Sequence, residues 1–248
     1  MSMDRSGVRG WKRHAVDLFD RIVLHLPFAT ELVNQGISKN LAILAAFHLL
    51  SRIELEGDYL EFGVFRGETF RNAIRAARQG FRATREGRFL GRFFAFDSFQ
   101  GLPPVPSMNE RTNVYAAGEF PAPRAAFDRT VASVRQHAVI EVVPGWFADT
   151  LSAETARRLG LQKAAFVNVD CDLYESTVTV LEFVTPLLQT GTVLYFDDWF
   201  SQRGSMNHGE ARAAAEWLAR NPQIRLVDYR NAGITGKMFL VNIVQSTV

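Results

Sequence analysis

Apolar residues recur at three- and four-residue spacings in the first quarter of the chain, which predicts helices over residues 11–26 and 38–54. Ser38 is a plausible N-cap for the second of these helices. From residue 57 onward, short apolar runs alternate with longer amphipathic segments. The short runs predict strands at 57–63, 92–97, 138–143, 164–170, 191–198, 224–229 and 237–244. The segments between them predict helices at 67–80, 124–137, 149–160, 176–188 and 208–222.

This alternation of strands and helices predicts an α/β fold. Strands joined by helices form right-handed crossovers, so the sheet should be mostly parallel with helices on both faces. The last two strands have only NAGITG between them, which is too short for a crossover and predicts an antiparallel hairpin. We therefore expect a Rossmann-like, doubly wound sheet of seven strands over residues 57–248, preceded by a helical extension over residues 1–56.

One long irregular stretch interrupts this pattern between about residues 98 and 124, and it holds five of the nine prolines. Loops of this length inside a compact domain are uncommon and usually functional. We interpret the stretch as a lid over an active site.

Composition narrows the class of ligand. The chain has 28 basic and 26 acidic residues, a balance that gives no reason to expect nucleic acid or an anionic membrane surface as a partner. No apolar run reaches the ~18 residues of a membrane span. The single cysteine, Cys171, argues against structural zinc and fits a reducing compartment. We expect a cytoplasmic protein that binds a small molecule.

Ligands of open α/β sheets bind at the carboxyl ends of the strands, so the residues at those ends are the candidates for chemistry. The run EFGVFRG places Glu61 and Gly63 at the end of the first strand and Gly67 at the start of the following helix. Free N–H groups at that helix start, together with Arg66, suit a carboxylate, and Glu61 suits an ammonium. An amino-acid moiety carries both charges. Asp97 ends the second strand, where an acidic residue commonly accepts hydrogen bonds from ribose hydroxyls.

Three further carboxylates end the two strands that one helix connects: Asp170, Asp197 and Asp198. Carboxylates that converge on one crevice repel each other unless a cation neutralises them. Oxygen ligands without histidine or cysteine favour a hard ion such as Mg²⁺. We expect a Mg²⁺ site here.

Four runs together resemble the class I S-adenosylmethionine-dependent methyltransferases, and more narrowly the macrocin O-methyltransferase (TylF-like) family. These runs are EFGVFRG, FDSFQGLP, DCDLYEST and FDDW, spread from Glu61 to Trp199. The resemblance implies a cofactor, S-adenosylmethionine, and a Mg²⁺ ion bound by Asp170, Asp197 and Asp198. It implies the following cofactor contacts: Glu61, Gly63 and Gly67 with the methionine part, Asp97 and Ser98 with the ribose, and Gly145, Trp146 and Phe147 near the adenine. Asp170 would then lie beside both the cofactor and the metal.

Members of this family methylate hydroxyls, commonly of sugars on natural products, so the resemblance implies a glycoside as the acceptor. Asp170 is the first candidate for the general base and His208, in the loop after FDDW, is the second. Tyr174 and Trp199 are candidates for the acceptor pocket, since aromatic faces stack on sugar rings.

Two other functions remain open at this point. A catechol-type Mg²⁺-dependent O-methyltransferase would use the same acidic trio on an aromatic diol. A non-catalytic cofactor-binding module would keep the fold alone. The N-terminal helices either cover the acceptor or form the interface of a homo-oligomer.

Overall fold

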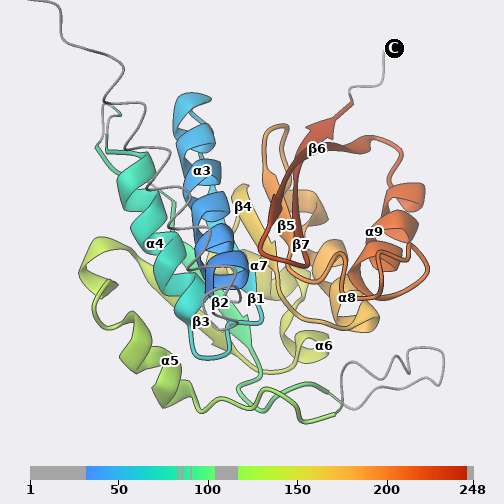
Figure 1. Ribbon diagram of the computed structural model, residues 1–248, viewed down its shortest axis with the longest axis horizontal. Coiled ribbons are helices and arrows are strands. Elements are labelled where there is room, and N and C mark those ends of the chain that lie inside the picture. The colour runs from blue at the N-terminus through green and yellow to red at the C-terminus, as the bar shows by residue number, and fades with distance from the viewer. Residues whose placement is uncertain (1–31, 83, 85–86, 90, 104–116, 245–248) are drawn as a thin grey trace, which may run out of the picture.

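The computed structural model describes residues 32–82, 84, 87–89, 91–103 and 117–244 (Figure 1). The predicted helix over 11–26 and residues 104–116 of the predicted lid over 98–124 lie outside the described residues. In the described part, no helix is long and apolar enough to span a bilayer.

One seven-stranded sheet forms the centre of the molecule, in the order β3-β2-β1-β4-β5-β7-β6. Its strands are β1 Asp58–Phe62, β2 Phe93–Asp97, β3 Ile140–Pro144, β4 Ala164–Val169, β5 Val193–Phe196, β6 Ile224–Ala232 and β7 Gly236–Ile243. The first five strands are parallel, and β7 is antiparallel to both β5 and β6. The predicted parallel sheet that finishes in an antiparallel hairpin is confirmed.

The helices occupy most of the predicted segments. They are α3 Ser38–Arg52, α4 Glu68–Gly80, α5 Arg124–Val131, α6 Phe147–Thr150, α7 Ala153–Leu159, α8 Tyr174–Val184 and α9 Gly209–Arg220, with short helices η1 Leu32–Ile37, η3 Arg135–His137 and η4 Thr185–Leu187.

Several boundaries differ from the sequence pattern. The predicted helix over 124–137 ends at Val131, and η3 follows it as a separate short helix. Ser38 is not an N-cap, because the π-helical turn η1 runs directly into α3 and Ile37 already has helical dihedral angles. The predicted helix over 149–160 is broken at Ser152, whose side chain accepts a hydrogen bond from the Thr155 backbone N–H and thereby starts α7.

Helices cover both faces of the sheet, as Figure 1 shows for α3, α4 and α5 on one side and α8 and α9 on the other. Alternating side chains along each strand supply the two cores: Tyr59 faces the α3–α4–α5 layer, whereas Leu60 faces the α8–α9 layer. Helix α3 belongs to the first layer, since Phe47 and Leu50 are completely buried against the sheet. The N-terminal part of the described chain is therefore packed into the domain.

Candidate active site

A cavity of about 760 Å³ opens at the carboxyl ends of the central parallel strands. The neighbouring strands β2, β1, β4 and β5 each contribute strand-end residues to its wall. It brings together ten of the predicted site residues: Glu61, Gly63, Asp97, Ser98, Gly145, Trp146, Phe147, Asp170, Asp197 and Asp198. The cavity therefore lies where the sequence analysis expected a ligand, at the carboxyl ends of the parallel strands.

Gly63 allows the loops after β1 and β4 to touch. Its φ is +87°, and a Cβ atom there would lie 1.8 Å from the backbone oxygen of Asp170. Since the obstacle is backbone, no side chain could be accommodated. The contact fixes Asp170 beside the glycine loop, and the Asp170 N–H donates to the Phe62 carbonyl at 2.9 Å.

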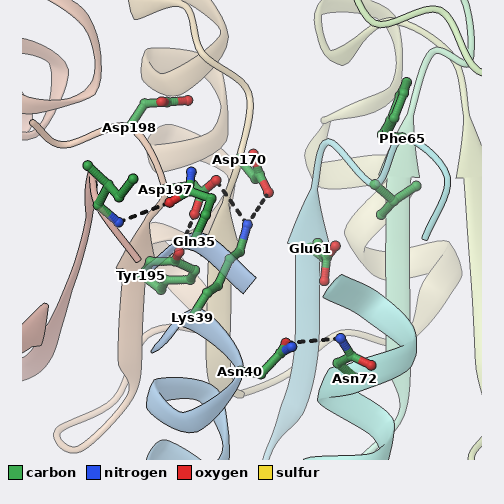
Figure 2. A network of polar contacts seen from close by, with 12 residues as sticks. Gln35, Lys39, Asn40, Glu61, Phe65, Asn72, Asp170, Tyr195, Asp197 and Asp198 are labelled. Carbon is green, nitrogen blue, oxygen red and sulfur yellow. Dashed lines mark hydrogen bonds and ion pairs between the residues drawn. The ribbon is translucent and has the colours of Figure 1, made fainter. Parts of the chain in front are cut away.

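Glu61 is a completely buried carboxylate whose side chain lines the cavity (Figure 2). The Tyr59 hydroxyl donates to its Oε2, whereas Oε1 has no hydrogen-bond partner. Burial raises the pKa of Glu61 to about 7, although the Tyr59 hydroxyl and the Lys39 ammonium oppose the rise. An unpartnered buried oxygen of this kind fits the ammonium group of a bound amino-acid moiety.

Asp97 holds the glycine loop in place. Its Oδ2 accepts from the backbone N–H groups of Val64 and Phe65 at 2.8 and 2.9 Å, and its Oδ1 accepts from Phe99 N–H at 2.7 Å. Oδ1 accepts one of these bonds and can accept a second, so the predicted ribose contact remains compatible with this geometry.

The end of the cavity beside β3 is formed by the turn after that strand. Gly145 has φ +136°, and its N–H donates to the Asp97 carbonyl at 2.9 Å. Trp146 and Phe147 follow at the wall, and Phe147 packs edge-on against Phe62. Asp149, which the sequence analysis did not single out, lines the same end.

A lysine lies between two of the three predicted metal ligands. The Lys39 ammonium contacts Asp170 Oδ2 at 3.2 Å and Asp197 Oδ2 at 2.9 Å, as Figure 2 shows. The Tyr195 hydroxyl donates to the other oxygen of Asp197. The side chains of Lys39, Asp170 and Asp197 are 15%, 24% and 16% exposed, so this ion-pair network is shielded from water.

Burial and charge act against each other in this network. Burial lowers the pKa of Lys39, but the charges of Asp170 and Asp197 outweigh burial and hold it above its usual value. Burial and the neighbouring charge of Asp197 raise the pKa of Asp170, and Lys39 opposes that rise. Lys39 is therefore a cation in this crevice.

Asp198 turns away from the Lys39 ammonium (Figure 2). Its Oδ1 accepts from the Ser201 hydroxyl, and its backbone N–H donates to the buried Glu210 carboxylate at 2.9 Å. Burial and the charge of Asp198 raise the pKa of nearby Asp172 to about 9. Within the described residues, no three acidic, histidine or cysteine side chains form a ready metal cluster.

The donor set nevertheless suits a hard cation. Asp170 and Asp197 present oxygen atoms that already converge on a positive charge, which in this conformation is the ammonium of Lys39. Mg²⁺ at this place therefore stays a prediction with chemically fitting ligands.

Five predicted residues do not line this cavity. The Arg66 guanidinium lies over the Phe65 ring, and Gly67, with φ +83°, packs against Phe127. The other three lie around α9 and β7: Tyr174 donates to Glu216 at 2.5 Å, Trp199 packs against Phe196 and Phe239, and His208 Nδ1 lies 3.1 Å from Ser205 Oγ. Their proposed roles remain predictions.

Lys39 and Tyr195 are the partners of the acidic pair that the sequence analysis missed. No local pattern marks Lys39, since Asp170 lies 131 positions away along the chain. Tyr195 lies two positions before Asp197 on the same strand, so both side chains point to one face.

Comparison with known proteins places these features in a family. The family model described as macrocin-O-methyltransferase (TylF) matches residues 39–221. A Streptomyces olivaceus protein named 8-demethyl-8-(2,3-dimethoxy-alpha-L-rhamnosyl)-tetracenomycin-C 4'-O-methyltransferase is 32% identical over 155 residues, which are 58% of this chain and 53% of the relative. Demethyldecarbamoylnovobiocin O-methyltransferase of Streptomyces niveus is 30% identical over 158 residues, 58% of this chain and 53% of the relative. The chain thus aligns with about half the length of these curated relatives.

Solved structures share the fold. The O-methyltransferase NovP superposes with a TM-score of 0.66 at 22% identity, covering 85% of this chain and 81% of NovP. CalS11, a calicheamicin methyltransferase, superposes with a TM-score of 0.61 at 20% identity, covering 97% of this chain and 98% of CalS11. The match to the family model runs from Lys39, which lines the cavity, past the end of α9 and so covers most of the chain. The chain therefore belongs to the macrocin O-methyltransferase (TylF) family.

Proposed function

We propose that this protein is an S-adenosylmethionine-dependent O-methyltransferase that methylates a hydroxyl of a sugar, in a glycosylated natural product or a saccharide, with Mg²⁺ as the cation. The observation that carries the proposal is that Glu61 and Asp170 line one cavity, at the strand ends where this fold binds its ligands. Glu61 suits the amino group of the cofactor, and Asp170 is suited to accept the proton of an acceptor hydroxyl.

The chain's own residues account for binding. Glu61 Oε1 would receive the cofactor ammonium, and Asp97 would accept hydrogen bonds from the ribose while it holds the glycine loop. Trp146 and Phe147 would cover the adenine. In other proteins of this fold, S-adenosylhomocysteine or S-adenosylmethionine is bound, as in a Bacillus cereus O-methyltransferase and in TomG.

Asp170 is the proposed general base. It lies at the cavity wall and is anchored through its backbone, so its carboxylate is positioned to take the hydroxyl proton while the oxygen attacks the methyl group. The cofactor supplies an electrophilic methyl group, and Mg²⁺ held by Asp170, Asp197 and Asp198 would favour the ionised hydroxyl as a Lewis acid. His208 is the second candidate for the base.

The side chains that line the cavity are more often acidic than basic. Among the described residues that line it, Lys39 is the single basic side chain, against nine acidic ones. The name of the Streptomyces olivaceus relative indicates a rhamnosyl group, and this supports a sugar as the acceptor.

The first test is calorimetric binding of S-adenosylhomocysteine with and without Mg²⁺. Glu61→Gln should weaken binding about tenfold or more. The matched surface variant Glu182→Gln on α8 should leave binding unchanged. Equal affinity of all three proteins would contradict the cofactor assignment.

The acceptor is tested by mass spectrometry after incubation with S-adenosylmethionine, Mg²⁺ and a panel of acceptors. Methylation of a rhamnosyl glycoside is the expected result, and methylation of a nucleotide-activated rhamnose instead would match the reaction named for CalS11. Methylation of catechols alone would show that the protein is a catechol-type O-methyltransferase. Cofactor binding without any methyl transfer would support a non-catalytic cofactor-binding module.

A further inference from the structure

The aspartates proposed to hold Mg²⁺ already hold a cation that the protein itself supplies. Lys39 Nζ lies between Oδ2 of Asp170 and Oδ2 of Asp197, at 3.2 and 2.9 Å (Figure 2). A Mg²⁺ ion would bind carboxylate oxygens at ~2.0–2.1 Å. An ion bound to these two oxygen atoms would lie within a few ångströms of the ammonium, where two positive charges repel strongly in a shielded crevice. The two cations are therefore alternatives.

The backbone that carries Lys39 is held on both sides. Upstream, the Gln35 side chain accepts from the Ile234 backbone N–H at 3.0 Å, which ties η1 to the turn between β6 and β7. Downstream, Asn40 is hydrogen-bonded to Asn72 of α4 at 2.9 Å. Since the start of α3 is fixed in this way, the four-carbon side chain of Lys39 is the part that can move.

The helix that carries Lys39 offers no counter-charge beside it. The first turn of α3 contains no acidic residue. The contacts with Asp170 and Asp197 are therefore the ion pairs that hold the ammonium in the crevice. A divalent ion that takes over the two aspartates removes the interactions that keep the ammonium in the crevice.

We propose that Lys39 competes with the divalent cation for the Asp170–Asp197 pair, keeping the two carboxylates assembled in the metal-free protein and withdrawing when the ion binds. Lys39 thereby sets the metal affinity of the site. This inference rests on the proposed function, because only there is the pair assigned to Mg²⁺.

The test measures metal binding without cofactor or acceptor. Mn²⁺ binding to the full chain is followed by electron paramagnetic resonance for the wild type, Lys39→Met and Lys39→Arg. Lys39→Met removes the charge and keeps a similar volume, so its Mn²⁺ affinity should rise about tenfold or more. Lys39→Arg keeps the charge and should bind Mn²⁺ no more tightly than the wild type. Lys163→Met, which removes an exposed lysine before β4, is the matched control and should behave as the wild type.

A second measurement uses the wild type alone, in case Lys39→Met fails to fold. Amine-reactive labelling is quantified by peptide mass spectrometry, with Lys163 as the internal reference. Mg²⁺ should increase labelling of Lys39 and leave Lys163 unchanged.

Equal or weaker Mn²⁺ affinity in Lys39→Met would overturn the proposal, as would labelling of Lys39 that does not respond to Mg²⁺, or the absence of metal binding in every variant. The proposed function fails separately, through the titration with S-adenosylhomocysteine in the absence of Mg²⁺, because that arm compares the wild type with Glu61→Gln and contains no metal.

Discussion

The two ends of the cavity stabilise partly buried carboxylates in different ways. Asp97 receives three backbone N–H groups from its own loop and from the adjoining glycine loop. Asp170 and Asp197 receive the ammonium of Lys39, which comes from a helix that precedes the whole sheet. Backbone donors belong to the fold and cannot leave, whereas a lysine side chain can swing away. The Asp97 end is a preorganised binding site, whereas at the Asp170–Asp197 end one bound cation can be exchanged for another.

The largest effect on activity should come from a substitution of Asp170, the proposed base at the end of the cavity that holds Lys39. Asp170→Asn removes the proton acceptor, so the rate of methyl transfer should fall about 10²–10⁴-fold. Binding of S-adenosylhomocysteine should remain nearly intact, because Glu61 and Asp97 are unchanged. The measurements are single-turnover kinetics and calorimetry.

Asp228→Asn is the matched control, since Asp228 pairs with Lys237 on the β6–β7 hairpin and does not line the cavity. It should keep wild-type activity. Activity retained in Asp170→Asn would exclude Asp170 from the mechanism and bring His208 forward.

The next largest effect should come from breaking the preorganised end. Asp97→Ala leaves three backbone N–H groups without their acceptor, which should lower the free energy of unfolding by about 3 kcal/mol and weaken S-adenosylhomocysteine binding about a hundredfold. Denaturant unfolding and calorimetry measure the two losses. Asp128→Ala, at an exposed ion pair of α5, should change stability much less. Similar losses in the two variants would contradict the role given to Asp97.

The sequence predicted the fold closely because strand and helix periods alternate without ambiguity. The apolar run around Glu61 and the one before Asp170 each became a buried parallel strand, and residues 233–235 of the short NAGITG connection became the hairpin turn. The break at Ser152 could not be foreseen as easily, since a capping serine inside an apolar-periodic segment competes with helix continuation only through local hydrogen bonds.

The sequence predicted those cavity residues that lie at the ends of strands. Glu61, Gly63 and Asp97 lie in strand-end motifs, and the fold alone brings them together. Lys39 contacts Asp170 across a sequence separation of 131 residues, and no periodicity specifies such a pair. The acidic trio predicted a metal ion, and two of its members contact the ammonium of Lys39, which the sequence did not single out.

A smaller effect is expected from pH at the cofactor end. The pKa of Glu61 in the free protein is about 7, and only its ionised form attracts the cofactor ammonium. Below that pH the ionised fraction falls, so the Kd for S-adenosylhomocysteine should rise about tenfold between about pH 8 and about pH 6. Calorimetry across this range measures the change.

Glu61→Gln is the control for this titration. The amide cannot ionise, so its weaker binding should not vary with pH over the same range. A pH dependence that persists in Glu61→Gln would assign the titration to another group.

The smallest effect should come from Tyr174, which sequence reasoning placed in the acceptor pocket. Its hydroxyl donates to Glu216 at 2.5 Å, and the Arg212 guanidinium lies 4.1 Å from the centre of its ring, so its polar contacts go to α9. Tyr174→Phe removes only the hydroxyl, and because this group does not line the cavity, the KM for the acceptor should change less than about twofold. Steady-state kinetics with S-adenosylmethionine and a glycoside whose acceptor hydroxyl is free decide the point. A KM raised well beyond that range, with kcat unchanged, would place Tyr174 against the acceptor and extend the substrate site from the cavity toward α9.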